Sequence, residues 1–409
     1  MAILDGTALA QVLKIQYTQR KVNNICYGES ALLARIQKQT NFGGKLEQVA
    51  FQYGSPQGRG AAFAVAQGNI TPSVYDAVSV PRAKDYAFAE ITGEMIDAAK
   101  DNEYALLDGL KREIDNAFYT VARSIAAALF GAGGGARGKI GATTTLASPT
   151  LVLDDPNTVV NFEVGMVLNL GATDGTTGAK RTGTLTIIGI NRDTGTLTVN
   201  ANISTISGAA LGDFVFQNGD FESTRSMLTG LAGWIPWTAP TGGDNFFGLD
   251  RSKDPTRLAG LRFDGSGGPI EETIIKAAAR LVREGGKPDL CVLNPLDYAN
   301  LIVALGSKVI IENKQLPDAD IGMTAVKIHG PKGPIDVITD ANCPTGFFYL
   351  LTSSTWRFKT LLAAPRILGE SGDGLKLLRS PNSDSYQIRI GYYGNLLCDA
   401  PGWNLVGKL

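Results

Sequence analysis

The residues that could carry chemistry in this sequence are few, and the first candidate is a glycine-rich stretch. Residues 133–140 (GGGARGKI) match the glycines and the lysine of a nucleotide-binding P-loop. The position after that lysine must be Ser or Thr to hold magnesium, and here it is Ile140. A P-loop also follows a strand, whereas this stretch follows a predicted helix. We therefore interpret residues 133–140 as a flexible linker.

The single histidine, His329, is the next candidate. It lies in KIHGPKGP, a predicted hairpin turn, and neither GxSxG nor HExxH accompanies it. The acidic pairs at 154–155 and 271–272 fit a turn and a helix start. Asp318 and Asp320 could bind a cation, but two carboxylates alone are weak evidence for a metal site. We predict that the chain is not an enzyme and has no catalytic, cofactor or metal site.

The sulfur and indole side chains indicate packing. No two cysteines have CxxC or zinc spacing, so we expect buried thiols in a reducing compartment at Cys26, Cys291, Cys343 and Cys398. Trp234 and Trp237 flank Pro236, which we interpret as a packing anchor, not a base-stacking platform.

Composition limits the class of protein. With 409 residues, two or three domains are expected. The formal net charge of −1 lacks the basic excess of a dedicated nucleic-acid binder. The N-terminus has no signal-peptide pattern, and no apolar run reaches the roughly 18 residues of a membrane span. We expect a soluble protein made in the cytoplasm.

The first half of the chain predicts projecting elements and one long helix. Residues 1–40 favour short helices on an arm that is not a packed domain. Alternation at 49–53, glycines at 54–60 and a second extended stretch at 74–88 predict a projecting antiparallel hairpin with a mobile tip. A helix of roughly 40 Å is predicted from Asp101 to Gly131 by apolar residues three and four apart, namely Leu107, Leu110, Ile114, Phe118, Val121, Ile125 and Leu129.

The second half predicts two further bodies. Residues 141–217 are rich in Thr, Val, Ile and Gly and contain a hairpin turn at 191–195, which favours a small separate β-barrel or sandwich. Helices are predicted to begin at Pro269 and Pro295. Together with apolar strands at 289–293, 325–328, 335–339, 347–351 and 386–392, they indicate an α/β or α+β domain.

This order of parts resembles the Hong Kong 97-type major capsid proteins of tailed phages. Residues 288–298 (PDLCVLNPLDY) look like the strand-then-helix of that family's axial domain, and 333–338 and 346–350 look like its later strands. The implied fold class is α+β, the Hong Kong 97-type capsid fold. Its parts are an N-terminal arm, an extended hairpin (E-loop), a peripheral domain with a long spine helix and an axial α/β domain. An inserted small β-barrel or sandwich is added here.

The resemblance divides the chain into six parts. These are the arm at 1–48, the extended hairpin at 49–90, the peripheral domain with the spine helix at 91–140, the inserted β-domain at 141–217, the axial domain at 218–360, and C-terminal strands completing the peripheral and axial body at 361–409. The insertion departs from the simplest members of the family. A scaffolding segment is not evident in the arm, so the scaffold is expected to be a separate protein.

The resemblance implies a structural function. The chain would self-assemble into pentamers and hexamers that form the icosahedral head around the double-stranded DNA of a tailed phage, and would be found in the virion. Implied partners are a portal, a scaffolding protein, a decoration protein, and packaged DNA touching the inner face non-specifically; no membrane is implied. The alternatives are an encapsulin-like compartment shell, or another virion β-protein such as a tail tube or adhesin.

Two segments are predicted to contact neighbouring subunits. The first is the hairpin, through Phe51, Tyr53, Arg59, Phe63 and Val65. The second is Gly306–Gly322, interpreted as a loop near the five- or six-fold axis, whose contact residues would be Lys308, Glu312, Asn313, Lys314, Asp318 and Asp320. The β-domain is expected on the outer face of the shell.

Overall fold

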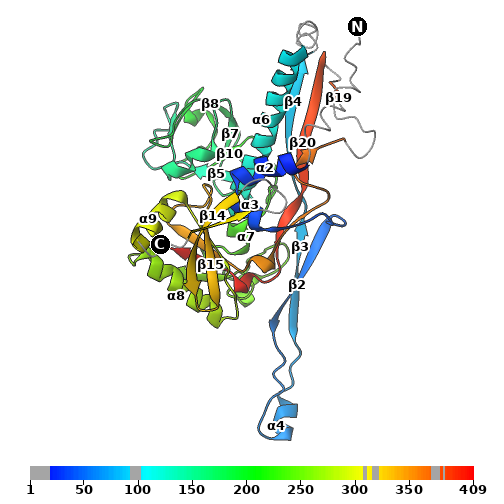
Figure 1. Cartoon of the computed structure of the whole chain (residues 1–409), viewed down its shortest axis with the longest axis vertical. Coiled ribbons are helices and arrows are strands. Elements are labelled where there is room, and N and C mark those ends of the chain that lie inside the picture. Colours follow the sequence, from blue (N-terminus) through cyan, green and yellow to red (C-terminus); the bar gives the residue numbers. More distant parts are fainter. Residues whose placement is uncertain (1–18, 93–102, 307–310, 316–321, 370–377, 381–382) are drawn as a thin grey trace.

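The chain forms a body with a long hairpin projecting from it. The computed structural model describes residues 19–92, 103–306, 311–315, 322–369, 378–380 and 383–409. The body consists of a spine layer, a small β-barrel beside it, and a seven-stranded sheet with two helices (Figure 1). The hairpin leaves the body opposite the end occupied by the long helix (Figure 1).

The spine layer is the long helix α6 (Glu103–Phe130) packed on a six-stranded sheet. The central strand of this sheet is β20 (Ser385–Cys398), which pairs with β4 (Ala83–Thr92), β17 (Trp356–Thr360), β18 (Arg366–Ile367) and β19 (Leu378–Arg379). A short strand, β1 (Gln37–Gln39), pairs with β17. The predicted helix is confirmed, because its apolar stripe is buried from Ile114 through Phe118 to Leu129. The predicted start of the helix, Asp101, lies outside the described residues.

The described part of the predicted arm forms short helices, and these helices pack against the core of the spine layer. Helices α2 (Gln19–Glu29) and α3 (Ala31–Arg35) bury Cys26, Leu32 and Leu33. Ser30 caps α3, since its hydroxyl oxygen accepts from the Leu33 N–H. The same hydroxyl donates to Asp340 Oδ2 at 2.7 Å, which ties the helix to a residue 310 positions later in the chain. Short apolar runs concealed this packing because they show no long periodic stripe.

The projecting hairpin is confirmed, with one correction to its second strand. Strand β2 (Leu46–Gly54) pairs with β3 (Val74–Pro81), and the short helix α4 (Phe63–Gly68) lies at the tip (Figure 1). The hairpin ends at Pro81, and the following strand β4 pairs with β20 instead. Tyr86 and Phe88 therefore belong to the spine sheet. Both strands alternate with the same period, so only the tertiary partner separates them.

Residues 136–217 form a closed six-stranded barrel with a core of its own. The strands are β5 (Ala136–Lys139), β6 (Thr150–Val152), β7 (Val167–Gly171), β8 (Leu185–Asn191), β9 (Thr196–Val199) and β10 (Phe214–Gln217), in the order β5-β10-β7-β8-β9-β6. The edge strands β5 and β6 meet through an Ile140–Leu153 bridge and the hydrogen bond from Asp154 N to Lys139 O at 2.9 Å. This closure selects the barrel over the sandwich. The predicted linker at 133–140 is wrong, since it supplies strand β5.

The seven-stranded sheet has two helices on one face and the main core on the other. Its order is β11 (Leu261–Asp264), β21 (Leu405–Lys408), β16 (Phe347–Leu351), β12 (Leu290–Leu293), β15 (Gly333–Thr339), β14 (Gly322–Gly330) and β13 (Ile311–Gln315). In β12, Cys291 and Leu293 pack with helices α8 (Ile270–Arg283) and α9 (Pro295–Leu305), whereas Leu290 and Val292 join the spine core. Burial on both faces explains the uninterrupted apolar sequence of this strand.

The tryptophans and cysteines pack as predicted. Trp234, in the one-turn helix α7 (Leu231–Trp234), is buried and donates from Nε1 to Leu396 O at 3.0 Å. Trp237 packs edge-on against Phe347. All four cysteines are free and buried. Burial raises the pKa of the Cys26 thiol to about 12, so this thiol is unreactive at neutral pH.

Candidate assembly surfaces

The polar side chains of the described residues do not form a catalytic constellation. His329 is exposed on β14, beside the turn into β15. Asp155 caps a short helical turn by accepting from Asn157 N, and Glu271 and Glu272 lie in the first turn of α8. Within the described ranges, groups of three or more potential metal-ligating residues are absent, as are helices long and apolar enough to cross a membrane. The predicted candidates Asp318 and Asp320 lie outside those ranges.

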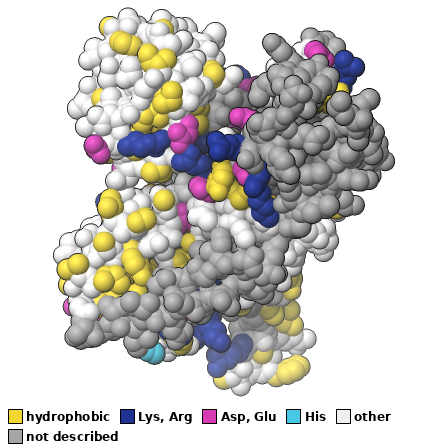
Figure 2. All heavy atoms as spheres, turned by 45° about the horizontal axis from the view of Figure 1, so that its top comes forward, with side chains coloured by type: hydrophobic (Ala, Val, Ile, Leu, Met, Phe, Trp, Pro, Cys, Tyr) yellow, Lys and Arg dark blue, Asp and Glu magenta, His cyan; other side chains and the backbone are white. Residues whose placement is uncertain are grey.

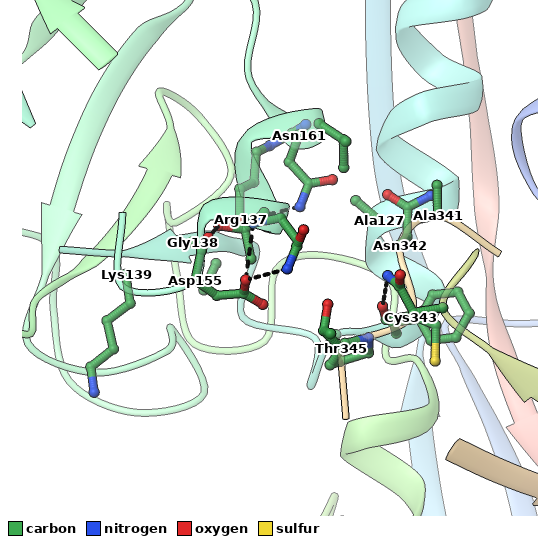
Figure 3. A pocket seen from close by; sticks show the side chains of 18 of the residues that line it. Ala127, Arg137, Gly138, Lys139, Asp155, Asn161, Ala341, Asn342, Cys343 and Thr345 are labelled. Atoms are coloured by element: carbon green, nitrogen blue, oxygen red, sulfur yellow. Dashed lines mark hydrogen bonds between the residues drawn. The ribbon is translucent and has the colours of Figure 1, made fainter. Parts of the chain in front are cut away.

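A cleft of about 270 Å³ separates the barrel from the loop that follows β15. Arg137, Asp155 and Asn161 lie on its barrel side and face Asn342 and Thr345 (Figure 3). Lys139 points away from these residues (Figure 3). In the P-loop-like stretch, Gly138 and Lys139 belong to barrel strand β5, and Gly133 lies in the segment that leads into it. The next element is another strand, not a helix, which removes the basis for phosphate binding there.

The hairpin tip exposes large apolar side chains. Phe63 is 84% exposed, Val65 54% and Ile70 68%. The tip projects far from the part of the body that the structure describes (Figure 1). Arg59 is also exposed, and its carbonyl accepts from Asn69 Nδ2 at 3.0 Å. Apolar groups gathered on a protruding element are typical of a contact surface.

The two predicted contact residues nearer the base are placed differently. Phe51 is buried in the core of its own subunit, so it does not need a neighbour to cover it, contrary to the prediction. Tyr53 is half-buried against the same core, and its carbonyl accepts from Arg257 Nη1 at 2.7 Å. Strand alternation alone could not show which end of the hairpin meets the body.

The base of the hairpin is fastened by contacts that sequence reasoning missed. Lys253 pairs with Asp76 at 3.1 Å, and Ser79 N donates to Phe247 O at 3.2 Å. On the other strand, Lys359 pairs with Glu47 at 2.5 Å. These partners are more than 160 residues apart, so no local signal marks them. The contacts fix the direction of the hairpin while its tip stays uncovered.

A second exposed aromatic surface lies on the spine sheet. Lys84, Tyr86, Phe88 and Glu90 alternate outward along β4, and Tyr86 is 46% and Phe88 59% exposed. Tyr86 packs edge-on against Tyr393 of β20, with ring centroids 5.9 Å apart. The alternation of outward side chains along residues 84–90 could have identified this surface, but the sequence prediction places these residues in the hairpin. The opposite face of β4 covers α6.

The barrel presents a largely uncharged outer surface. Figure 2 shows mostly white and yellow atoms over this lobe, with charged side chains gathered where it meets the rest of the molecule. Val164 and Ile188 are its most exposed large apolar residues, at 62% and 58%. At the junction, Glu163 pairs with both Arg123 and Arg192.

The segment predicted to lie near a symmetry axis is partly a strand. Glu312, Asn313 and Lys314 belong to β13, the edge strand of the seven-stranded sheet, which corrects the prediction of a loop for these positions. Its low apolar content concealed an edge strand paired on one side only. Lys308, Asp318 and Asp320 lie outside the described residues. The proximity of this segment to an axis stays a prediction.

The comparisons with known proteins support one fold. No family model and no curated protein matches the sequence. The capsid subunit of cyanophage A-1(L) is similar in structure, with a TM-score of 0.53 and 13% identity over 93% of this chain and 92% of that chain. Two further structures are more distant and carry no weight in the argument. One is the capsid protein of a native GTA particle, with a TM-score of 0.45 and 10% identity over 93% of this chain and 90% of that chain. The other is the SrpI encapsulin of Synechococcus elongatus PCC 7942, with a TM-score of 0.42 and 10% identity over 100% of this chain and 96% of that chain. From the order of its elements and its likeness to the cyanophage subunit, the chain has the Hong Kong 97-type capsid fold.

Proposed function

We propose that this chain is the major capsid protein of a tailed bacteriophage, a structural protein that self-assembles into pentamers and hexamers of an icosahedral head around double-stranded DNA. The observation that carries the proposal is the fastened hairpin with its exposed apolar tip, on a chain that matches a phage capsid subunit along nearly its whole length. An encapsulin-like compartment is the alternative that shares this fold.

The tip is best explained by a neighbouring copy of the chain. A two-stranded hairpin is marginally stable alone, and exposed Phe63 and Ile70 side chains are unfavourable in water. A contact between the tip of one subunit and a different surface of the next is heterologous. Such contacts form a closed ring when the rotation between successive subunits adds up to a full turn. Tyr86 and Phe88 on the spine sheet offer an apolar receiving surface of this kind.

The other surfaces have roles that follow from this arrangement. We place the barrel on the outer face, where it contacts neighbouring capsomers or replaces a separate decoration protein. The Gly306–Gly322 segment approaches the capsomer axis, where exposed ion pairs between copies contribute only about 0–1 kcal/mol each. A portal and a separate scaffolding protein complete the head, and packaged DNA contacts the inner face non-specifically.

The test is expression of the full chain alone, followed by sedimentation and electron microscopy. Capsomers, tubes or closed shells support a shell protein, whereas small discrete oligomers contradict it. Deletion of residues 55–67 should leave the spine helix and the seven-stranded sheet folded, as judged by circular dichroism, and should abolish normal shells. Global unfolding of that variant would show instead that the hairpin tip belongs to the core. Native particles that contain DNA and a portal support the phage head, and protein-filled particles would favour a compartment.

A further inference from the structure

The barrel joins the body through two neighbouring chain segments, 131–135 and 218–230. They are held together by an Ala132–Thr229 bridge and by hydrogen bonds of 3.0 Å from Met227 N to Gly133 O and from Gly230 N to Gly131 O. A Cβ atom at Gly133 would lie 2.5 Å from Thr229 Oγ1, so the glycines permit close packing here. The connection is a packed joint.

A buried charged cluster spans this joint. Arg137, on barrel strand β5, donates from Nε to Asp220 Oδ2 at 2.8 Å and from Nη2 to Ser124 Oγ at 3.3 Å. Ser124 lies on the spine helix α6 and hydrogen-bonds Asp85 of strand β4. Both side chains of the Arg137–Asp220 pair are about nine-tenths buried. The cluster thus links the barrel to two elements of the spine layer.

The charges in this cluster do not balance. Two carboxylates, Asp85 and Asp220, share one arginine, which leaves one negative charge in a largely buried site. Within the described part of the chain, the buried Asp85 Oδ2 atom and the buried hydroxyl of Tyr392 on β20 have no hydrogen-bond partner. Such orphaned groups are costly when the carboxylate is ionised.

Burial and the neighbouring charges favour a proton here. The pKa of Asp85 is raised to about 6, because burial and the Asp220 charge raise it by more than Ser124 and Arg137 lower it. Burial also raises the pKa of Asp220, against the effect of Arg137. The pKa of Tyr392 is raised by burial and by both carboxylates, so its hydroxyl stays neutral. Asp85 of β4 thus interacts with Tyr392 of β20, Ser124 of α6, Arg137 of β5 and Asp220 of the 218–230 segment.

We propose that Arg137, Asp220, Ser124, Asp85 and Tyr392 form a proton-operated clamp that sets how firmly the barrel is held on the spine layer. With one proton on the carboxylate pair, the cluster is neutral overall and the joint is closed. With both carboxylates ionised, the excess charge favours solvent entry and local opening of the joint. The clamp belongs to the single subunit, so it does not depend on the proposed function.

The test measures the barrel's position across the cleft at two pH values. Spin labels are attached to the full chain at Asn157→Cys on the barrel and Ala341→Cys on the opposite side, both exposed, while the four native cysteines are buried. Pulsed electron resonance should give a narrow distance distribution at pH 5 and a broader one at pH 8, with a midpoint near pH 6. The Asp85→Asn variant should give a narrow distance distribution at both pH values. Asp193→Asn, in an exposed turn, is the control and should respond to pH as the parent does.

Hydrogen exchange of segments 131–135 and 218–230, corrected for intrinsic rates, gives a second readout that needs no variant. A pKa of about 6 in the closed joint against 3.8 for a free carboxyl allows protection to fall by up to about 100-fold between pH 4 and pH 7. An unchanged parent distance distribution together with pH-independent protection would overturn the clamp. So would an Asp85→Asn variant with the full pH response of the parent.

Discussion

The proposed role of the hairpin tip predicts a large assembly defect without a folding defect. The perturbation is the triple substitution Phe63→Ser, Val65→Ser and Ile70→Ser. Full burial of one such side chain is worth about 1.5–3 kcal/mol. Scaled by the exposed fractions of 84%, 54% and 68%, a neighbour that covers all three gains about 3–6 kcal/mol per subunit. At 1.4 kcal/mol per tenfold, the contact should weaken by about 10²- to 10⁴-fold.

The assay uses light scattering and sedimentation to measure the protein concentration at which shells or capsomers first form. The triple variant should need a concentration at least 100-fold higher, and its unassembled subunits should keep the thermal unfolding midpoint of the parent. The matched control is Gln67→Ser, an exposed polar position on the same short helix, which should assemble normally. A triple variant that assembles at the parent's threshold would refute the reasoning.

Three further predictions concern the free subunit. Phe118→Ala, fully buried on the spine helix, should lower the free energy of unfolding by about 3–5 kcal/mol, whereas Tyr119→Ala, 44% exposed beside it, should change it by about 0.5 kcal/mol in denaturant titrations. Asp340→Ala should lower the free energy of unfolding by about 2–4 kcal/mol, because the Ser30 hydroxyl and the Leu32 N–H lose the carboxylate that accepts their hydrogen bonds. The free energy of unfolding should fall by up to about 3 kcal/mol as pH rises from about 4 to about 6, since the folded chain holds the Asp85 proton more tightly than the unfolded one; Asp85→Asn should remove this slope.

Elements with a strong local pattern could be predicted from the sequence. The stripe from Ile114 to Leu129 defines the spine helix, and the Asn191–Gly195 turn defines the β8–β9 hairpin of the barrel. The apolar run at 290–293 marks a strand buried on both faces. In each case, a single segment carries the information, because periodicity or turn chemistry acts within a few residues.

Elements defined by distant partners could not be predicted. The glycines of residues 133–140 suggest a mobile linker, but residues 136–139 form strand β5, and Gly133 allows the close packing of the joint. Tyr86 and Phe88 alternate as the hairpin does, and only pairing with β20 places them in the spine sheet. At the assembly surfaces, the exposed tip followed from its composition. The contacts at the hairpin base, such as Lys253 with Asp76, have no local signature.

The geometry of the joint supports the interpretation of the barrel as an inserted unit. Gly230 N donates to Gly131 O at 3.0 Å, so the chain leaves the end of the spine helix and returns to nearly the same point. The barrel between these points closes on itself and buries its own set of apolar residues, separate from the spine core. A unit with its own core and adjoining ends can be added to a fold without disturbing the helix before it or the strands after it. In the proposed clamp, its orientation depends on the few groups that cross the joint, among them Arg137, Asp85 and Asp220.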